Sequence, residues 1–300
     1  MLSILIPSYN HAAFVKAAIA SARSISIPGK RIVVIDDASP DGSAKLISEY
    51  LDQEDARDVE LICKPVNKGA VDSVNMFLAN CESEFVYFMA SDDVAIAPGI
   101  ETLVRRLERE PGLQFLIGGG SNLFPDGSRT PIYSGKHDAF FSLEPRRLVR
   151  ATFLDCPTPI LCQSSVFRLS AIRAVGGFDP SMIADDYALF TRLFLAYHRR
   201  GIDFDFVPHV PCVEYRHHEI NSHRNLPRQA LATRQVIEHL APSDLRNRAS
   251  GDKLAYYTLV ALRRLDLKST RSLLSMLRLR EVVWFVAGLF NNLMMYARHR

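Results

Sequence analysis

Short, mostly apolar runs alternate with helical patterns over the first 120 residues. The runs occupy 2–6, 31–35, 59–63, 85–89 and 113–117. Runs with so few polar positions are typical of strands buried on both faces of a sheet. Apolar residues recur at helical spacing in the segments between them, 12–22, 43–51, 70–80 and 99–109. This alternation predicts an α/β domain, with a mostly parallel, Rossmann-like sheet flanked by crossover helices.

The pattern becomes irregular after residue 120. The turn-rich segment "NLFPDGSRTPIYSG" precedes a predicted helix at 144–153, a strand at 163–168 and an amphipathic helix at 185–198. Beyond about residue 224 the spacing of apolar residues is helical throughout. We therefore expect a main domain over 1–222 and a C-terminal helical appendage over 223–300.

Four polar clusters follow predicted strands or lie in loops that could return to the same edge of the sheet. They are "PSYN" (7–10), "DDASPDG" (36–42), "SDD" (91–93) and "DD" (185–186). In open α/β sheets, ligands bind beyond the carboxyl ends of the strands. Adjacent carboxylates such as Asp92 and Asp93 need a positive partner there, and Mg²⁺ or Mn²⁺ prefers oxygen ligands. An alternative is that these side chains only cap helices and turns.

Several blocks resemble the family 2 glycosyltransferases, which have the GT-A fold. The blocks are "SILIPSYNHAAFVKAAIASA", "VVIDDASPDGS", "NKGAVDSVN", "EFVYFMASDDVAIAPGIETL", "GGFDPSMIADDYALFTRL" and "VEYRHHEINS". They occur in the order typical of that family and cover roughly residues 2–222. The resemblance implies a GT-A domain that binds a nucleotide-sugar.

The resemblance assigns a nucleotide pocket to Pro7, Tyr9, Asn10, Asp37, Asn67, Gly69 and Asp92. Within it, Tyr9 would lie near the base, and Asp37 would accept the imide N–H of a pyrimidine. The turn from Asn67 to Gly69 would close over the nucleoside. Alternatively, Tyr9 packs in the core, while Asn67 and Gly69 only cap a helix.

The resemblance also implies metal ligands and a base. Asp93 is expected to bind Mn²⁺ or Mg²⁺ directly, and Asp92 to contact ribose or reach the metal through water. A position where the family often has aspartate holds Ala90 instead. In "YRHH", His218 takes the position of the family's histidine beside Arg216, with a metal or phosphate role or a structural one.

Asp186 matches the family's general base, which takes a proton from the acceptor hydroxyl in a single displacement with inversion. Asp185 stands where glutamate is more usual in the family, and it also suits a helix N-cap. The expected reaction moves a sugar from a UDP- or dTDP-sugar to a hydroxyl of a glycan or lipid-linked acceptor, in bacterial surface-polysaccharide assembly. A catalytically silent nucleotide-sugar-binding or scaffold protein of the same fold is the alternative.

Composition narrows the remaining classes. The net charge of +3 does not indicate a nucleic-acid-binding protein. The sequence contains no GxGxxG, GxxxxGK[ST] or GxSxG motif, which disfavours dinucleotide-binding, P-loop and hydrolase classes. The five cysteines have no metal-binding spacing, so we expect reduced thiols in a cytoplasmic protein. No basic segment precedes the first strand, so no signal peptide is expected.

The C-terminal segment differs from the rest in charge. Residues 241–300 hold 11 Lys and Arg but only 4 Asp and Glu. The apolar run 282–290, with Trp284, is shorter than the ~20 residues needed to cross a bilayer. A basic amphipathic helix at the inner face of the membrane would suit these features. Packing on the protein's own core or on a second copy is the alternative.

Overall fold

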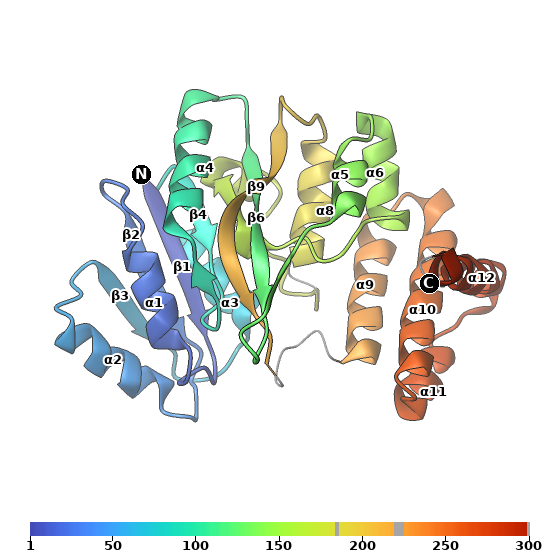
Figure 1. Cartoon of the computed structure of the whole chain (residues 1–300), viewed down its shortest axis with the longest axis horizontal. Helices are drawn as coiled ribbons and strands as arrows, with labels where there is room; N and C mark the ends of the chain where they lie inside the picture. The colour runs from blue at the N-terminus through green and yellow to red at the C-terminus, as the bar shows by residue number, and fades with distance from the viewer. Residues whose placement is uncertain (184–185, 219–224, 299–300) are drawn as a thin grey trace.

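The computed structural model describes residues 1–183, 186–218 and 225–298, and its first half confirms the predicted strand–helix alternation (Figure 1). The elements are β1 (Leu2–Ser8), α1 (Val15–Arg23), β2 (Arg31–Asp36), α2 (Ser43–Gln53), β3 (Val59–Cys63), α3 (Ala70–Ala79), β4 (Phe85–Phe88), β5 (Val94–Ala95) and α4 (Ala97–Arg109). β1 pairs in parallel with both β2 and β4, and β2 pairs in parallel with β3. The predicted mostly parallel α/β architecture is therefore correct.

The second half completes the sheet with strands that pair in both directions. Its elements are β6 (Phe115–Leu123), β7 (Arg129–Pro131), α5 (Gly135–Phe141), α6 (Pro145–Leu154), the short helix η1 (Cys162–Ser164), β8 (Ser165–Arg168), α7 (Leu169–Ala174), α8 (Asp186–Ala196) and β9 (Phe204–Arg216). Across the described residues the strand order is β3-β2-β1-β4-β8-β6-β9-β5, with β7 paired to β6. β8 is antiparallel to both of its neighbours.

Our sequence analysis did not predict β9 as a strand. Its sequence, "FDFVPHVPCVEYR", contains two prolines and alternates polar with apolar residues, so it lacks the continuous apolar run of the other strands. β9 pairs with β6 through an irregular register beside Gly119. A β-carbon on Gly119 would stand 2.0 Å from the carbonyl oxygen of Pro208, so the glycines at 118–120 permit this close approach.

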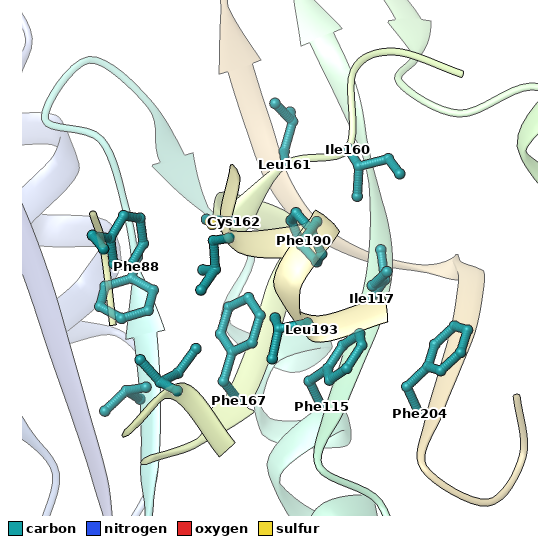
Figure 2. Packing of buried hydrophobic residues seen from close by; sticks show 14 of the residues in the cluster. Phe88, Phe115, Ile117, Ile160, Leu161, Cys162, Phe167, Phe190, Leu193 and Phe204 are labelled. Carbon is teal, nitrogen blue, oxygen red and sulfur yellow. The ribbon is translucent and has the colours of Figure 1, made fainter. Parts of the chain in front are cut away.

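Both faces of the sheet are buried under helices. Alternate residues of β1 point in opposite directions: Leu5 belongs to one apolar cluster, while Ile4 and Ile6 belong to the other. Helices α1, α2 and α4 cover the second cluster, and α3, α5, α6 and α8 cover the first. Figure 2 shows the phenylalanines at the centre of the first cluster, where the rings of Phe115 and Phe204 stack with centroids 5.1 Å apart. Burial on both faces explains the apolar runs in the sequence.

The C-terminal region is helical, as predicted. It consists of α9 (Leu226–Leu240), α10 (Ser243–Arg263), α11 (Leu267–Ser275), the short helix η3 (Leu279–Glu281) and α12 (Val282–Arg298). Phe153 of α6 shares a buried cluster with Ile237 of α9 and Leu245 of α10, so these helices pack directly on the sheet-bearing part. The predicted domain boundary at 222/223 lies outside the described residues.

The tail contains two helices, α11 and α12, that are joined through η3. The chain turns between α11 and α12, where Glu281 is buried and accepts a hydrogen bond from the backbone N–H of Arg278. None of the helices in the described part of the chain combines the length and the apolar character needed to cross a membrane. The five cysteines, all in described parts of the chain, are free thiols, and four of them are buried.

Candidate active site

A pocket of about 320 Å³ opens at the carboxyl ends of β1, β2 and β4. These strands, together with β9, run toward the lower edge of the sheet in Figure 1. The start of α3, the η1 turn, the first residue of α8 and the segment that follows β9 complete the pocket wall. Parallel pairing therefore brings together segments that are far apart in the sequence.

The pocket gathers most of the residues expected from the sequence. The predicted residues that line it are Pro7, Tyr9, Asp37, Asp92, Asp186 and His218. The lining does not include Asn10, Asn67, Gly69 or Asp93. Asp185 lies outside the described residues. Residues of all four polar clusters thus meet at one edge of the sheet: three clusters follow strands, and the fourth contributes Asp186 at the start of α8.

Asp37 is a buried carboxylate held by three donors. Its Oδ1 accepts a hydrogen bond from the Lys68 backbone N–H at 3.0 Å and lies 2.5 Å from the Lys64 ammonium. Its Oδ2 accepts a hydrogen bond from the Gly69 backbone N–H at 2.6 Å. Burial acts to raise the pKa of Asp37, but these hydrogen bonds outweigh it and hold the pKa below its usual value. Asp37 is therefore an ionised acceptor at the pocket wall, and its Oδ2 retains a further lone pair.

The turn from Asn67 to Gly69 supports Asp37. The Gly69 N–H, which bonds to Asp37, also donates to Asn67 Oδ1 at 3.0 Å, and Gly69 has a positive φ of 88°. Gly69 therefore contacts Asp37 directly from outside the pocket lining, and Asn67 supports the turn through the same N–H.

Two loops form the rim of the pocket next to Tyr9. The backbone N–H of Asn10 donates to Ser39 Oγ at 3.1 Å, and that of Ala12 donates to Asp41 Oδ2 at 3.0 Å. These bonds tie the loop after β1 to the loop after β2. Tyr9 is 42% exposed and lines the pocket, so its ring is open to a ligand and is not packed in the core.

Asp92 lies between two histidines. Its Oδ2 is 2.7 Å from His218 Nε2, and its Oδ1 is 3.8 Å from His11 Nδ1. One ligand atom from each of these three residues falls within 4.8 Å of the others. Burial lowers the pKa of His11, with Asp92 opposing the shift, so its ring is disposed to be neutral. Two imidazoles and one carboxylate form a donor set that suits Mn²⁺ and other divalent metal ions.

Asp93 has a different environment from its neighbour. It is 1% exposed, and its Oδ1 accepts a hydrogen bond from the Arg216 backbone N–H at 2.9 Å. Among the described residues its buried Oδ2 has no hydrogen-bond partner. Burial and the charge of Asp92 raise the pKa of Asp93 well above its usual value, although Arg216 opposes the shift. Arg216 therefore supplies part of the positive partner that the two carboxylates require.

Arg216 and Phe14 also hold His218 in place. The Arg216 Nε donates to the Asp92 carbonyl oxygen at 2.9 Å, and its guanidinium carbon lies 5.3 Å from the centroid of the Phe14 ring. The Phe14 ring in turn stacks on the imidazole of His218, with centroids 5.1 Å apart. The end of β9 is thus fastened to the loop after β4, and His218 faces Asp92.

Asp186 begins α8 and lines the pocket. Its Oδ2 accepts a hydrogen bond from the Cys162 backbone N–H at 3.2 Å. A carboxylate in the first turn of a helix is stabilised by the helix dipole. The position therefore suits a negatively charged group that accepts a proton.

Sequence reasoning missed several residues of the pocket wall. His11 was not selected, although it directly follows "PSYN" in the sequence. The side chains of Gln163 and Tyr215 also line the pocket. Gln163 lies in the η1 turn, which carries no pattern that indicates ligand binding, whereas Tyr215 lies on β9 within "VEYRHHEINS", a block from which only His218 and Arg216 were considered.

The fold and the pocket together define a GT-A type protein, and solved structures support that class. A mannosyltransferase from Pyrobaculum calidifontis, in complex with GDP-Man and Mn²⁺, aligns with 97% of this chain and 86% of its own at a TM-score of 0.58 and 16% identity. Residues 1–349 of Staphylococcus aureus TarS, in complex with UDP-GlcNAc, align with 96% of this chain and 79% of their own at a TM-score of 0.59 and 15% identity. At these identities the likeness is one of fold.

The chain belongs to glycosyl transferase family 2, because the model of that family matches residues 3–168. A poly-beta-1,6-N-acetyl-D-glucosamine synthase from Staphylococcus epidermidis is 24% identical over 194 residues, which is 65% of this chain and 46% of the relative. An uncharacterized glycosyltransferase from Haemophilus influenzae is 29% identical over 93 residues, 31% of this chain and 36% of the relative. The chain thus spans less than half the length of these curated relatives.

Proposed function

We propose that the protein is a metal-dependent, inverting glycosyltransferase that moves a sugar from a nucleotide-sugar to an acceptor hydroxyl. One observation carries the proposal: Asp37, the Asp92–histidine group and Asp186 line a single pocket at the carboxyl edge of the sheet. These are a base-recognition group, a metal-binding group and a proton acceptor. Family membership supports the same reaction class.

The metal would be held by His11, Asp92 and His218. Their ligand atoms lie within 4.8 Å of one another, and all three line the pocket, so the donor set fits Mn²⁺ or Mg²⁺, with the two imidazoles favouring Mn²⁺. We expected Asp93 to be the direct ligand, but it lies outside the pocket lining, and we assign that role to Asp92 instead. When bound, the ion would offset the charge on the leaving nucleoside diphosphate.

The donor nucleotide would bind at the β1 and β2 side of the pocket. Asp37 offers a carboxylate acceptor to an imide N–H, a group that uracil and thymine carry, and the exposed ring of Tyr9 can stack on a base. We therefore propose a UDP- or dTDP-sugar. Asp37 is preorganised for this role because Lys64, Lys68 and Gly69 already orient it.

Asp186 would act as the general base. It is placed at a helix start and held by the Cys162 N–H, and it lines the same pocket as Asp37 and Asp92. A base here takes the proton from the acceptor hydroxyl as the oxygen attacks the anomeric carbon. The nucleoside diphosphate leaves from the opposite face, and the configuration inverts.

The acceptor is proposed to be a glycan or a lipid-linked sugar, in bacterial surface-polysaccharide assembly at the cytoplasmic face of the membrane. The similarity to a poly-beta-1,6-N-acetyl-D-glucosamine synthase supports the polysaccharide setting. A silent nucleotide-sugar-binding protein of the same fold would keep Asp37 and Tyr9, but it would have no need for a proton acceptor beside the metal-binding group.

Donor hydrolysis and transfer test this proposal. The protein is incubated with UDP-, dTDP- and GDP-sugars, with manganese or with EDTA, and release of the nucleoside diphosphate is followed. We expect release from a UDP- or dTDP-sugar in manganese and little release in EDTA. Tight binding of a nucleotide-sugar without turnover under any condition, including a panel of glycan acceptors, would favour the silent binding protein.

A further inference from the structure

Helix α12 presents an exposed apolar face at the end of the molecule farthest from β3 (Figure 1). The exposed residues recur at helical spacing: Val283 is 73% exposed, Val286 59%, Phe290 64% and Leu293 54%. Leu279, just before the helix, is 91% exposed. No charged residue occurs from Val282 to Met294. Contiguous apolar surface of this kind marks a site of interaction with a partner or a membrane.

The opposite side of α12 is fixed, so the helix cannot rotate to bury this face. A β-carbon on Gly251 of α10 would lie 2.8 Å from Trp284 Cβ, and one on Gly288 would lie 3.0 Å from Ala255 Cβ. The buried carboxylate of Glu281 accepts a hydrogen bond at 2.8 Å from Arg234 of α9. Close packing and a buried ion pair therefore hold the exposed face outward.

The charges around this face are basic. Residues 262–294 contain six Lys and Arg and two Asp and Glu, and of the two acids Glu281 is buried while Asp266 caps the start of α11. Arg280 is exposed beside Leu279, and the exposed Arg278 pairs with Glu238 of α9. The Arg248 guanidinium lies 5.4 Å from the centre of the Trp284 ring. An apolar stripe with a basic border and a half-exposed tryptophan is typical of a helix that lies in a membrane interface.

A second copy of the chain fits this surface less well. A twofold interface places the same patch of both copies against itself, so the basic border would face like charges. An anionic lipid surface supplies the opposite charge and an apolar layer together.

We propose that α12, with Leu279 and Arg280 before it, docks the protein on an anionic lipid surface. Val283, Val286, Phe290 and Leu293 enter the interface between headgroups and acyl chains, while Arg280 contacts lipid phosphates. The proposal stands apart from the chemistry of the pocket, because binding to lipid requires no nucleotide, metal or acceptor.

Co-sedimentation of the full chain with vesicles tests this docking. One vesicle type is phosphatidylcholine alone, and the other contains about one third phosphatidylglycerol. We expect at least tenfold stronger binding to the anionic vesicles, and weaker binding at high salt because screening removes the phosphate contacts. Equal binding to both vesicle types, or to neither, would contradict the proposal.

Matched variants separate the contribution of the apolar residues to lipid binding from that of the basic residues. Val286→Ser with Phe290→Ser should weaken anionic binding about tenfold or more, because it removes apolar area that enters the interface. Ile202→Ser, which removes an aliphatic side chain that is 56% exposed on a loop before β9, should change nothing. The same loss of binding in both variants would show that α12 has no special role.

The contribution of charge is tested with Arg280→Gln, which is expected to weaken binding about fivefold. Arg278→Gln should have a smaller effect, because Arg278 already pairs with Glu238. Lys45→Gln and Arg57→Gln, at exposed positions far along the chain, serve as controls and should have little effect. Light scattering on the same samples tests the alternative, in which a second copy of the chain binds the exposed face of α12. A dimer that dissociates in the Val286→Ser, Phe290→Ser variant, without vesicle binding by the parent chain, would overturn the proposal in favour of a second copy.

Discussion

The pocket and the exposed face of α12 arise in opposite ways. In the pocket, charged groups that are costly to bury are gathered at strand ends, where partners face them, such as Lys64 for Asp37 and His218 for Asp92. On α12, apolar groups that are costly to expose remain in water although the rest of the helix is tightly packed. Both arrangements oppose simple folding preference, and each therefore points to a ligand. The pocket fits a small charged ligand, and the helix face fits an extended surface.

The largest effect is expected from Asp186→Asn. Asparagine keeps the size of the side chain and can still contact the Cys162 N–H, but it cannot take a proton. Transfer should fall by about 10²–10⁴, while donor binding stays near normal. Initial rates and calorimetric donor affinity on the same preparation would check this split. As a control, Asp58→Asn alters a surface ion pair with Arg23 and should leave the rate unchanged. Near-normal turnover of Asp186→Asn would place the base elsewhere, with Asp185 the first residue to examine.

Lys64→Met should reduce stability and make it depend on pH. The change leaves the buried Asp37 without its ammonium partner, a loss of roughly 3 kcal/mol in the free energy of unfolding. In the parent chain the pKa of Asp37 is lowered from 3.8 and that of Lys64 is raised from 10.5. The ionised Asp37 therefore stabilises the folded chain at any pH above its usual pKa, and this stabilisation is lost only in acid. The charged Lys64 stabilises the folded chain at any pH below its usual pKa, and this stabilisation is lost only in alkali.

In Lys64→Met the pKa of Asp37 rises, because burial is no longer offset by the lysine. A carboxyl group with a raised pKa in the folded state binds its proton more tightly there, so the stability lost by the variant should shrink as the pH falls from 8 to 5, a range in which the parent pair contributes a constant amount. Denaturant unfolding at both pH values measures the difference. Lys45→Met, at an exposed position, provides the control. An unchanged gap between Lys64→Met and the parent at the two pH values would argue against this account of Asp37.

A smaller loss is expected where α12 meets α10. In Gly251→Ala the new methyl would stand 2.8 Å from the Glu281 carbonyl oxygen and from Trp284 Cβ, so the helices must separate. We expect a cost of about 1–3 kcal/mol from overpacking. Gly135→Ala is the matched control, because no atom lies within 4 Å of its β-carbon and alanine favours the helix. Thermal unfolding of both variants would check the contrast, and equal stability would show that α12 is loosely attached.

The pocket was largely predictable, because the topology of a parallel sheet dictates where strand ends meet. Asp37 and Asp92 could be placed from their positions after apolar runs. The choice between Asp92 and Asp93 could not be made, since adjacent side chains point in different directions and the pairing of β5 with β9 decides which one faces the pocket. That pairing involves β9, whose prolines conceal it as a strand.

For α12, the sequence offered an exposed apolar face and a covered one as alternatives, and it could not decide between them. The apolar residues from Val282 to Phe290 fit a helix covered by its own core equally well. Two features of the packed structure decide whether the face is exposed or covered. They are the turn before Val282 and the close contact between α10 and α12 at Gly251 and Gly288. Periodicity identifies an apolar face, but tertiary contacts decide whether that face is covered.

The central claim is that Asp92 and its histidines form the metal group of a nucleotide-sugar pocket, and two adjacent histidines allow its most direct test. His218 faces Asp92, whereas His217 Nε2 lies 2.9 Å from Asn122 Oδ1 and its ring stacks on Phe124. Calorimetric titration of UDP with manganese or EDTA is compared for His218→Ala, His217→Ala and the parent. We predict that manganese strengthens UDP binding to the parent and to His217→Ala, and that His218→Ala loses about 10–100-fold of that gain. Equal manganese dependence in all three proteins would contradict the account.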